Sequence, residues 1–257
     1  MDPAEIIRIK DLLPTDLGSD EVKEQVAADI LRRSIFSARM EDLRHLAVIR
    51  DVCAGVVAGE INQATARERL LASLARIGHS PLDGGGIANP ASIRRLDLII
   101  DTQRQMAASV ANMAAETPAT LEEWPAHELV RFVGRSMPRA DWPQRWQSAA
   151  EAVGYEGVAR HTARMVALKS SPIWQALGDG AGGFRDTLGN PYPPFAYNSG
   201  LSWADVSRDE AIELGLLSSS DAALSPQDPP SLSPSESDIA DAVSRLGFDE
   251  DIFSDLA

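Results

Sequence analysis

A run of prolines and aromatic residues at Asn190–Gly200, NPYPPFAYNSG, sets the strongest limit on what the second half of this chain can form. Proline fixes φ and lacks an N–H, so a segment this rich in proline cannot form a regular helix. Tryptophans gather upstream and beside it, at Trp124, Trp142, Trp146, Trp174 and Trp203. Each can bury a large apolar area and carries one N–H to satisfy. These features predict a small domain of short strands and loops around an aromatic core.

The alternative is that the same aromatic side chains form a contact surface for a partner. Both interpretations point to the aromatic and proline residues of this region, together with two phenylalanines near the C-terminus. The structural or interaction candidates are therefore Trp124, Trp142, Trp146, Trp174, Tyr192, Pro193, Pro194, Phe195, Trp203, Phe248 and Phe253.

The first part of the chain has helical periodicity instead. Apolar residues keep roughly helical spacing across 20–57, where Ser19 can cap the N-terminus, and the pattern predicts one long helix. A second helix is expected from Asn62 to Ile77, with Gly78 as its stop, so that the two form a helical hairpin. A third, long helix is expected over Pro90–Ala115.

After Pro118 the predicted elements are short. Glu128–Val133 and Arg164–Leu168 have strand patterns, and a helix is expected from Asp141 to Val153. Another short helix is expected over Ser207–Leu214. The expected fold is α+β and mostly α, with a helical region at 1–116 and a small Trp-rich α+β domain at 117–217.

The last forty positions differ in composition. Between Ser218 and Ala257 there are nine acidic residues and one basic residue, a net charge of −8. Ser, Pro, Asp and Ala dominate as far as Ser237, which predicts a disordered linker. Apolar residues then return among the acids, as in a short amphipathic peptide. Residues 218–257 are thus expected to be a disordered acidic tail whose end either has no role or docks on a partner.

Composition also limits the partners. The net charge of −14 gives few bases to neutralise phosphates, so direct nucleic-acid binding is not expected. No apolar run approaches the roughly 18 residues of a membrane span, and the N-terminus does not resemble a secretory signal, so we expect synthesis in the cytoplasm and no membrane contact. A single cysteine, Cys53, excludes an internal disulfide.

Catalytic groups are few. Glu41 and His45 are four positions apart on an expected helix, and Cys53 lies eight residues further, but a metal site normally needs three or four ligands. We interpret the Glu41–His45 pair as a surface ion pair and Cys53 as an inert apolar residue, and expect no catalytic residue, metal or cofactor. The alternative is a hydrolase or transferase that brings Glu41, His45 or His161 into one pocket.

Several segments together resemble a known family. Arg95-Leu96-x-x-Ile99-x-x-Thr102, followed by Gln103 and Ala107, resembles a helix of the Mu-type phage minor head proteins. Further on, the likeness continues in Ala167-Leu168, Ser171-Pro172-x-Trp174, Tyr192-Pro193-Pro194-Phe195 and Arg208–Leu216, and a prophage variant of the family also shares Ala64–Arg67. The resemblance covers roughly Arg33 to Leu217.

The resemblance implies a head-morphogenesis protein of a tailed phage or prophage, present in few copies in the virion head. It would act near the portal through contacts with portal or capsid proteins, with no small-molecule substrate and no chemistry of its own. The family's closing Cys-Arg-Cys is absent here, and Asn198-Ser199-Gly200 stands near that place, so no role of those cysteines is transferred. The remaining alternative is a cytoplasmic regulatory adaptor that binds through its acidic tail.

Overall fold

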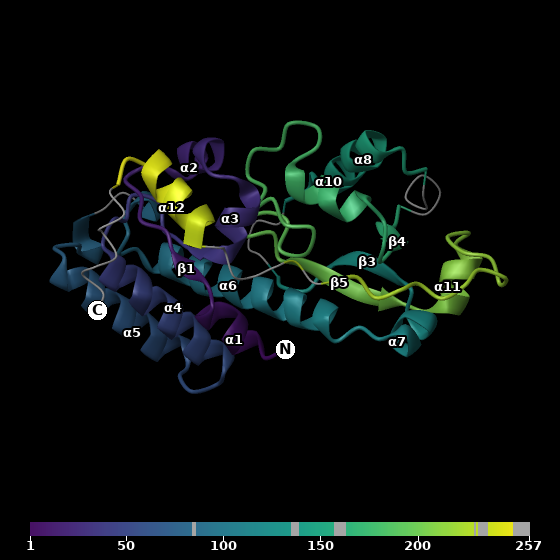
Figure 1. The fold of residues 1–257 in the computed structure, drawn as a ribbon, viewed down its shortest axis with the longest axis horizontal. Coiled ribbons are helices and arrows are strands. Elements are labelled where there is room, and N and C mark those ends of the chain that lie inside the picture. The colour runs from purple at the N-terminus through teal and green to yellow at the C-terminus, as the bar shows by residue number, and fades with distance from the viewer. Residues whose placement is uncertain (84–85, 135–138, 157–162, 229, 231–235, 249–257) are drawn as a thin grey trace. The chain divides into compact units, whose positions relative to one another are not determined.

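A computed structural model describes residues 1–83, 86–134, 139–156, 163–228, 230 and 236–248 of the chain (Figure 1). They fall into two compact units, Met1–Ala111 with Pro230–Ala257 (unit 1) and Asn112–Pro229 (unit 2). The fold is α+β and mostly helical, as predicted. The described residues contain two small sheets, one of them inside the region that the sequence predicts to be helical. The hairpin of helices followed by a long helix, and the small mixed domain after it, are likewise present.

Unit 1 is largely helical. Its elements in chain order are α1 (Pro3–Arg8), β1 (Asp11–Leu12), α2 (Ser19–Gln25), α3 (Ala28–Arg33), β2 (Ser34–Ile35), α4 (Leu43–Val57), α5 (Gln63–Arg76), the 3-10 turns at Pro81–Asp83 and Gly86–Ala88, α6 (Ile93–Ala114), whose last turn passes into unit 2, and α12 (Glu236–Arg245). The two short strands β1 and β2 pair in parallel, with Asp11 opposite Ser34.

The predicted hairpin is formed by α4 and α5. The Asn62 side chain accepts a hydrogen bond from the Thr65 N–H at 2.9 Å and so starts α5, as the sequence indicates. Gly78, at φ +87°, follows the end of α5 in a conformation that favours glycine. A contact of 3.0 Å between His45 Nδ1 and Ser73 Oγ joins the buried faces of the two helices.

The single long helix predicted over 20–57 is wrong. The chain instead forms α2, α3, β2 and α4, because Val26 and Ser34 are extended and end α2 and α3. Gly18, not Ser19, caps α2, and its N–H is held by Glu21 at 2.7 Å. Asp42 starts α4 by accepting the His45 N–H at 2.6 Å. The side chain of an Asp inside an apolar pattern can bind a backbone N–H and start a new helix. The apolar residues therefore keep helical spacing within several short helices and not along one long helix.

Unit 2 is built on a three-stranded antiparallel sheet. Its elements are α7 (Pro118–Glu123), β3 (Ala126–Arg131), α8 (Trp142–Val153), β4 (Val166–Leu168), α10 (Ile173–Asp179), β5 (Leu201–Val206) and α11 (Arg208–Glu213). The strand order is β4-β3-β5, so β3 is central (Figure 1). The predicted strands at 128–133 and 164–168 correspond to β3 and β4, whereas β5 was not predicted.

The two faces of this sheet serve different cores. Alternate residues point to opposite faces of a strand. Leu129, Ala167 and Leu201 therefore join the aromatic core with α8 and α10. Their neighbours form a smaller core with Ala211 of α11, made by Ala126, Val166 and Val206. Because both faces are covered at its start, β3 is more buried there than the half-buried strand that the sequence predicts.

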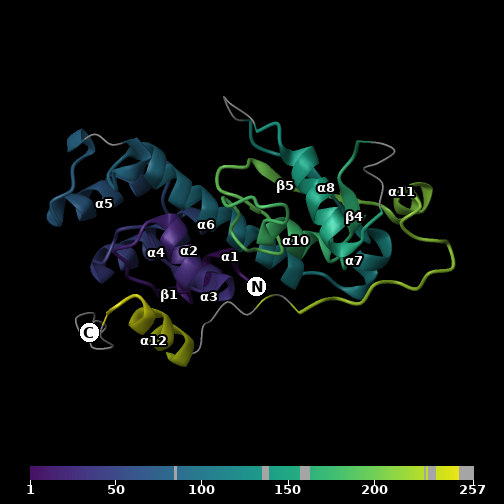
Figure 2. The same cartoon turned by 90° about the horizontal axis from the view of Figure 1, so that it is seen from above.

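The C-terminal peptide belongs to unit 1. The sequence sets 218–257 apart as one disordered tail, but the structure places α12 on the N-terminal helices, and it lies beside α3 in both views (Figures 1 and 2). Helix α12 packs there because it carries a stripe of apolar residues, which the sequence also indicates. Residues 218–228 form no helix or strand, and residues 229, 231–235 and 249–257 lie outside the described part of the chain.

Among the described residues, we find no helix with the length and apolar character needed to cross a membrane.

A buried lysine crosses the core of unit 1. Lys10 is 1% exposed, and its Nζ donates to Gln103 Oε1 at 2.8 Å. Burial lowers the pKa of this amine to about 7, against a small opposing effect from Cys53. Burial likewise raises the pKa of the Cys53 thiol to about 12. The amine and the thiol therefore make the stability of unit 1 depend on pH in opposite directions.

We predict that the free energy of unfolding of unit 1 rises between pH 7 and pH 8.5. In that window the unfolded Lys10 keeps its proton and the folded one loses it, so stability increases by up to about 1.4 kcal/mol per pH unit. The window ends below pH 9. Above that pH the unfolded Cys53 loses its proton while the folded one keeps it, so stability begins to fall with pH. Urea unfolding followed by far-UV circular dichroism measures the slope.

The matched variants are Lys10→Met and Lys23→Met. Lys10→Met should remove the slope, whatever it does to absolute stability through the Gln103 amide that it leaves unpaired. Lys23→Met, at a partly exposed lysine of α2, should keep it. An unchanged slope in Lys10→Met would contradict the assignment.

Candidate functional site

Trp174 of α10 lies at the centre of the aromatic core of unit 2. Its ring centroid is 5.4 Å from those of Trp146 and Trp203, and 6.1 Å from those of Phe195 and His127. Most of these pairs are edge-to-face, a favourable geometry for aromatic rings. The indole Nε1 donates to the Leu168 carbonyl at 2.9 Å, so the N–H of this buried ring is satisfied.

The proline and aromatic segment is part of this core and not a surface loop. Tyr192 and Phe195 are 0% and 1% exposed, and the Pro193–Pro194 peptide bond is cis. Asn190 Nδ2 donates to the Pro194 carbonyl at 3.1 Å, which closes the turn. The backbone passes so close to α10 that a Cβ on Gly178 would lie 1.8 Å from the Asn190 carbonyl oxygen. A glycine is required there.

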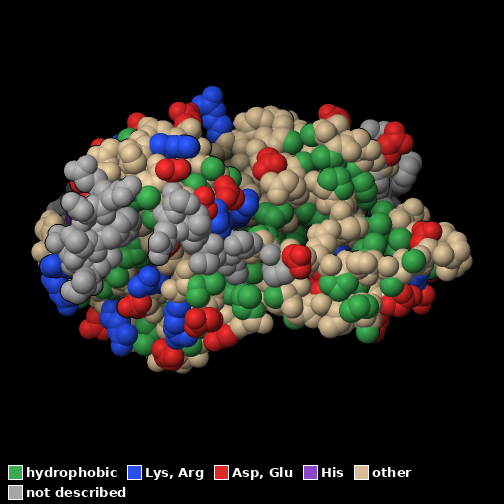
Figure 3. Space-filling view, in the orientation of Figure 1, with side chains coloured by type: hydrophobic (Ala, Val, Ile, Leu, Met, Phe, Trp, Pro, Cys, Tyr) green, Lys and Arg blue, Asp and Glu red, His purple; other side chains and the backbone are tan. Residues whose placement is uncertain are grey.

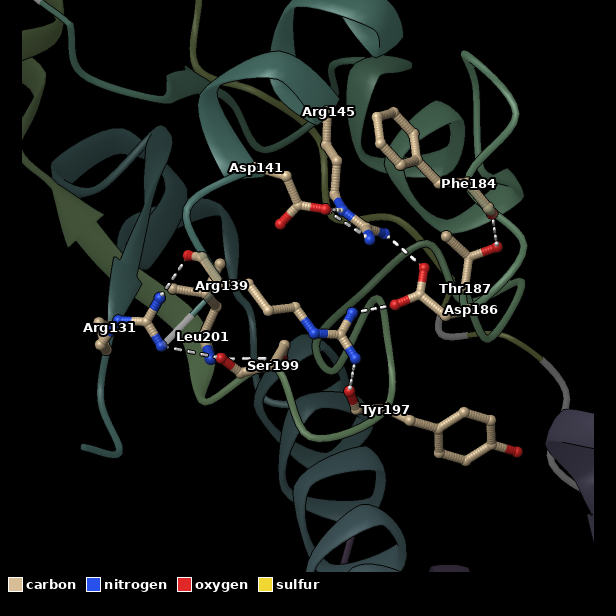
Figure 4. Close-up of polar contacts among 10 residues, drawn as sticks. All are labelled: Arg131, Arg139, Asp141, Arg145, Phe184, Asp186, Thr187, Tyr197, Ser199 and Leu201. Carbon is tan, nitrogen blue, oxygen red and sulfur yellow. Dashed lines mark hydrogen bonds and ion pairs between the residues drawn. The ribbon is translucent and has the colours of Figure 1, made fainter. Parts of the chain in front are cut away.

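A network of arginines and aspartates holds the outer side of the same loops (Figure 4). Arg145 of α8 donates to Asp141 Oδ2 and to Asp186 Oδ1, both at 2.8 Å, and its guanidinium lies 4.3 Å from the Phe184 ring centroid. Arg139 pairs with the second oxygen of Asp186 and donates to the Tyr197 carbonyl at 2.7 Å. Figure 4 shows Asp186 pointing between the two arginines.

This network extends to the end of the central strand. Arg131 Nη1 donates to the Ser199 carbonyl at 3.0 Å. Partial burial would raise the pKa of Asp186, but the hydrogen bond from Arg145 and the charge of Arg139 lower it below its usual value. The aspartate is thus held ionised, and its charge is used to bind the loop to α8.

A second charged cluster lies across the strands. Lys169, just after β4, has its Nζ 3.0 Å from both Glu116 Oε1 and Asp205 Oδ1. The register of β3 and β5 places His127 opposite Asp205, with 3.3 Å between Nδ1 and Oδ1, and the His127 ring stacks on Trp203 at 4.3 Å. Burial lowers the pKa of His127, whereas contacts from His127 and then Lys169 lower the pKa of Asp205 to about 2.

A hollow beside this cluster is too small for an organic substrate. It has about 20 Å³ of interior space and is lined by His127, Lys169, Trp203 and Leu224, among others. A water molecule needs about that much room, whereas ligand pockets measure several hundred Å³. The arrangement is therefore suited to a partly buried charge network around a water rather than to binding a metabolite.

The structure places most of the sequence-predicted residues in cores. Those that are less than a tenth exposed in unit 2 are Trp142, Trp146, Trp174, Tyr192, Pro193, Pro194 and Phe195. Trp203 is half-buried, and Trp124, at the end of α7, is 36% exposed. Phe248 is partly buried against the apolar cluster that contains α12. Phe253 lies outside the described residues.

The predicted surface ion pair between Glu41 and His45 is wrong. Glu41 is exposed and precedes α4, so the two do not share a helical face. His45 is buried against Ser73, and burial lowers its pKa to about 4. Cys53 is buried, as expected of an apolar residue, and His161 lies outside the described residues. Within the described ranges, no three His, Cys, Asp or Glu side chains are arranged to hold a metal.

The sequence did not predict the network around Arg145 and Asp186 or the cluster around Lys169 and Asp205. Arg139, Arg145 and Asp186 come from separate segments, and no local spacing links them. The pair of His127 and Asp205 depends on β5, and only the first three residues of its sequence LSWADV alternate between apolar and polar. That strand would have placed Leu201, Trp203 and Asp205 on the face that carries His127.

Comparisons with known proteins do not identify a family. No family model matches this chain. No curated protein and no solved structure matches it either.

We predict that Arg145 stabilises unit 2 far more than Arg164 does. Both arginines bridge two carboxylates, but the Arg145 side chain is 8% exposed and that of Arg164 is 34% exposed. Arg145→Met leaves Asp186 and Asp141 without this partner and removes the contact with Phe184, which should cost about 2 kcal/mol, less than for a fully buried pair because both carboxylates are more than a third exposed. Arg164→Met should cost less than about 1 kcal/mol.

Urea unfolding followed by tryptophan fluorescence measures both losses, because all five tryptophans lie in unit 2. An equal loss in the free energy of unfolding of the two variants would contradict the prediction that Arg145 contributes more to the stability of unit 2 than Arg164 does.

Proposed function

We propose that this protein is a non-catalytic structural protein of a tailed phage or prophage, a minor head protein that acts in head morphogenesis. It would reside in the virion head in few copies, near the portal, and act through contacts with portal or capsid proteins. The proposal rests on the motif resemblance and on one structural observation that supports it.

That observation is the convergence of the resembling motifs. Ala167, Trp174 and Phe195 are separated in sequence, yet all three contribute to one core, in which Trp174 stacks on Phe195 and donates to the backbone carbonyl of Leu168. Large apolar side chains converge in any folded chain, but here a hydrogen bond and a ring contact join these particular motifs directly. The contact of these three motifs within unit 2 is expected if they mark the packing of one kind of module.

The use of the charged groups agrees with an assembly role. Arg145, Asp186, Lys169 and Asp205 are paired with one another or with neighbouring carboxylates, and the hollow beside Lys169 has room for about one water. Such groups stabilise loops.

Contacts with partners would then use the outer surface. Trp124 and Phe132, at the two ends of β3, are 36% and 67% exposed, and large exposed apolar groups often mark contact sites. On the face drawn in Figure 3, basic side chains are more numerous over unit 1, whereas hydrophobic and uncharged ones predominate over unit 2. That face of unit 2 is better suited to protein than to nucleic acid.

The test is quantitative mass spectrometry of purified, nuclease-treated particles induced from the strain that encodes the protein, normalised to the major capsid protein. We expect a few to some tens of copies per particle, and the same value for a Ser244→Ala variant, which changes an exposed position of α12. Absence from intact particles, with abundant protein in the cytoplasm, would overturn the proposal and favour the adaptor hypothesis.

A further inference from the structure

The C-terminal helix docks on residues from the other end of the chain. Ile239, Ala242 and Val243 of α12, with Leu246 just after it, pack on an apolar surface, here called the α2–α3 face, formed by Leu13, Val22, Val26 and Leu31. All eight are less than a tenth exposed, and Val22 and Val243 are fully buried. Without α12, the α2–α3 face would present these side chains to water.

The spacing of the α12 residues explains the fit. Positions 239, 242, 243 and 246 follow the i, i+3, i+4, i+7 pattern and form one stripe. A helix as short as Glu236–Arg245 is marginal in water alone, so docking supplies most of its stability. The face therefore selects a peptide that can present this stripe.

An ion pair at the rim fixes how the helix lies. Arg33 Nη2 is 3.2 Å from Asp238 Oδ2 and 2.7 Å from Asp29 Oδ2. The Arg33 side chain is 12% exposed, so the pair with Asp238 is partly shielded from solvent. Asp238 lies 205 positions from Arg33 in the sequence. The face thus recognises an acidic residue at the start of the apolar stripe.

The α12 helix follows unit 2 in the sequence. The helix is connected to unit 2, which ends at Pro229, through residues 230–235, a stretch that spans at most about 20 Å when extended. Every copy of the chain carries the same stripe and the same Asp238, and the contacts on the face do not depend on which copy provides them. Exchange of such an element between copies is the usual route of domain swapping.

We propose that the α2–α3 face is a docking site for α12 of a second copy, so that copies of this chain are linked through exchanged C-terminal helices. At low concentration the chain's own α12 occupies the face, because the tether keeps it nearby. At high local concentration, exchange joins one copy to the next. This inference does not rest on the proposed head function, and it would hold equally for an adaptor.

The test removes competition from the chain's own helix. Val243→Asp places a charge in the apolar stripe of α12 and leaves the α2–α3 face unchanged. Val22→Asp places a charge in the α2–α3 face and leaves α12 unchanged. Neither variant can pair with itself, but an equimolar mixture of the two full-length chains can form one exchanged contact. Analytical ultracentrifugation should show monomers for each chain alone and a 1:1 complex in the mixture.

The matched control replaces Val243→Asp by Ser244→Asp, which adds the same charge at an exposed position of α12. Its own helix still fills its face, so its mixture with Val22→Asp should give much less complex. A mixture of folded Val243→Asp and Val22→Asp chains that stays monomeric would overturn the proposal.

A second pair covers the case in which Val22→Asp fails to fold. Arg33→Glu and Asp238→Arg reverse the rim ion pair and leave the apolar cluster unchanged. Association should be stronger in the mixture, where opposite charges meet across chains, than in either variant alone. Equal association in all three samples would refute exchange, and because no particles are involved, this failure would leave the head-protein proposal standing.

Discussion

The burial of Trp174 is the constraint on which the second unit depends. Its ring fills the space between α10, the sheet and the proline segment, and its N–H reaches the Leu168 carbonyl. A large indole in that position requires neighbours of matching shape, which Trp146, Phe195 and Trp203 supply. The sheet has only three short strands, so aromatic packing rather than an extended hydrogen-bond ladder holds this unit together.

Irregular loops need partners for their backbone groups, and the arginines provide them. Arg131 and Arg139 donate to the Ser199 and Tyr197 carbonyls, which the proline segment leaves outside any ladder. Arg145 and Asp186 add a charged contact that joins α8 to the loop. Proline prevents helix and ladder, aromatic rings fill the core, and guanidinium groups satisfy the carbonyls that remain. Together these three features allow an irregular segment to pack into the core.

Elements specified by local signals could be predicted from the sequence. Asn62 caps α5 and Gly78 follows its end, and the helix expected from Asp141 to Val153 is α8. Features specified by distant partners could not. The break at Ser34 depends partly on the pairing of β2 with β1, and the position of α12 depends on apolar residues between 13 and 31. The Arg145 network and the pair of His127 and Asp205 likewise require the tertiary fold.

The central claim is that the proline and aromatic segment is core and not a docking loop. Hydrogen exchange on the intact protein tests it most directly. The Leu188 N–H donates to the Phe195 carbonyl at 3.0 Å, and the Gly189 N–H donates to the Gly178 carbonyl at 2.9 Å. These amides should exchange as slowly as that of Leu129 in the central strand. Exchange of Leu188 and Gly189 at the rate of an unprotected loop, while Leu129 stays protected, would contradict the account.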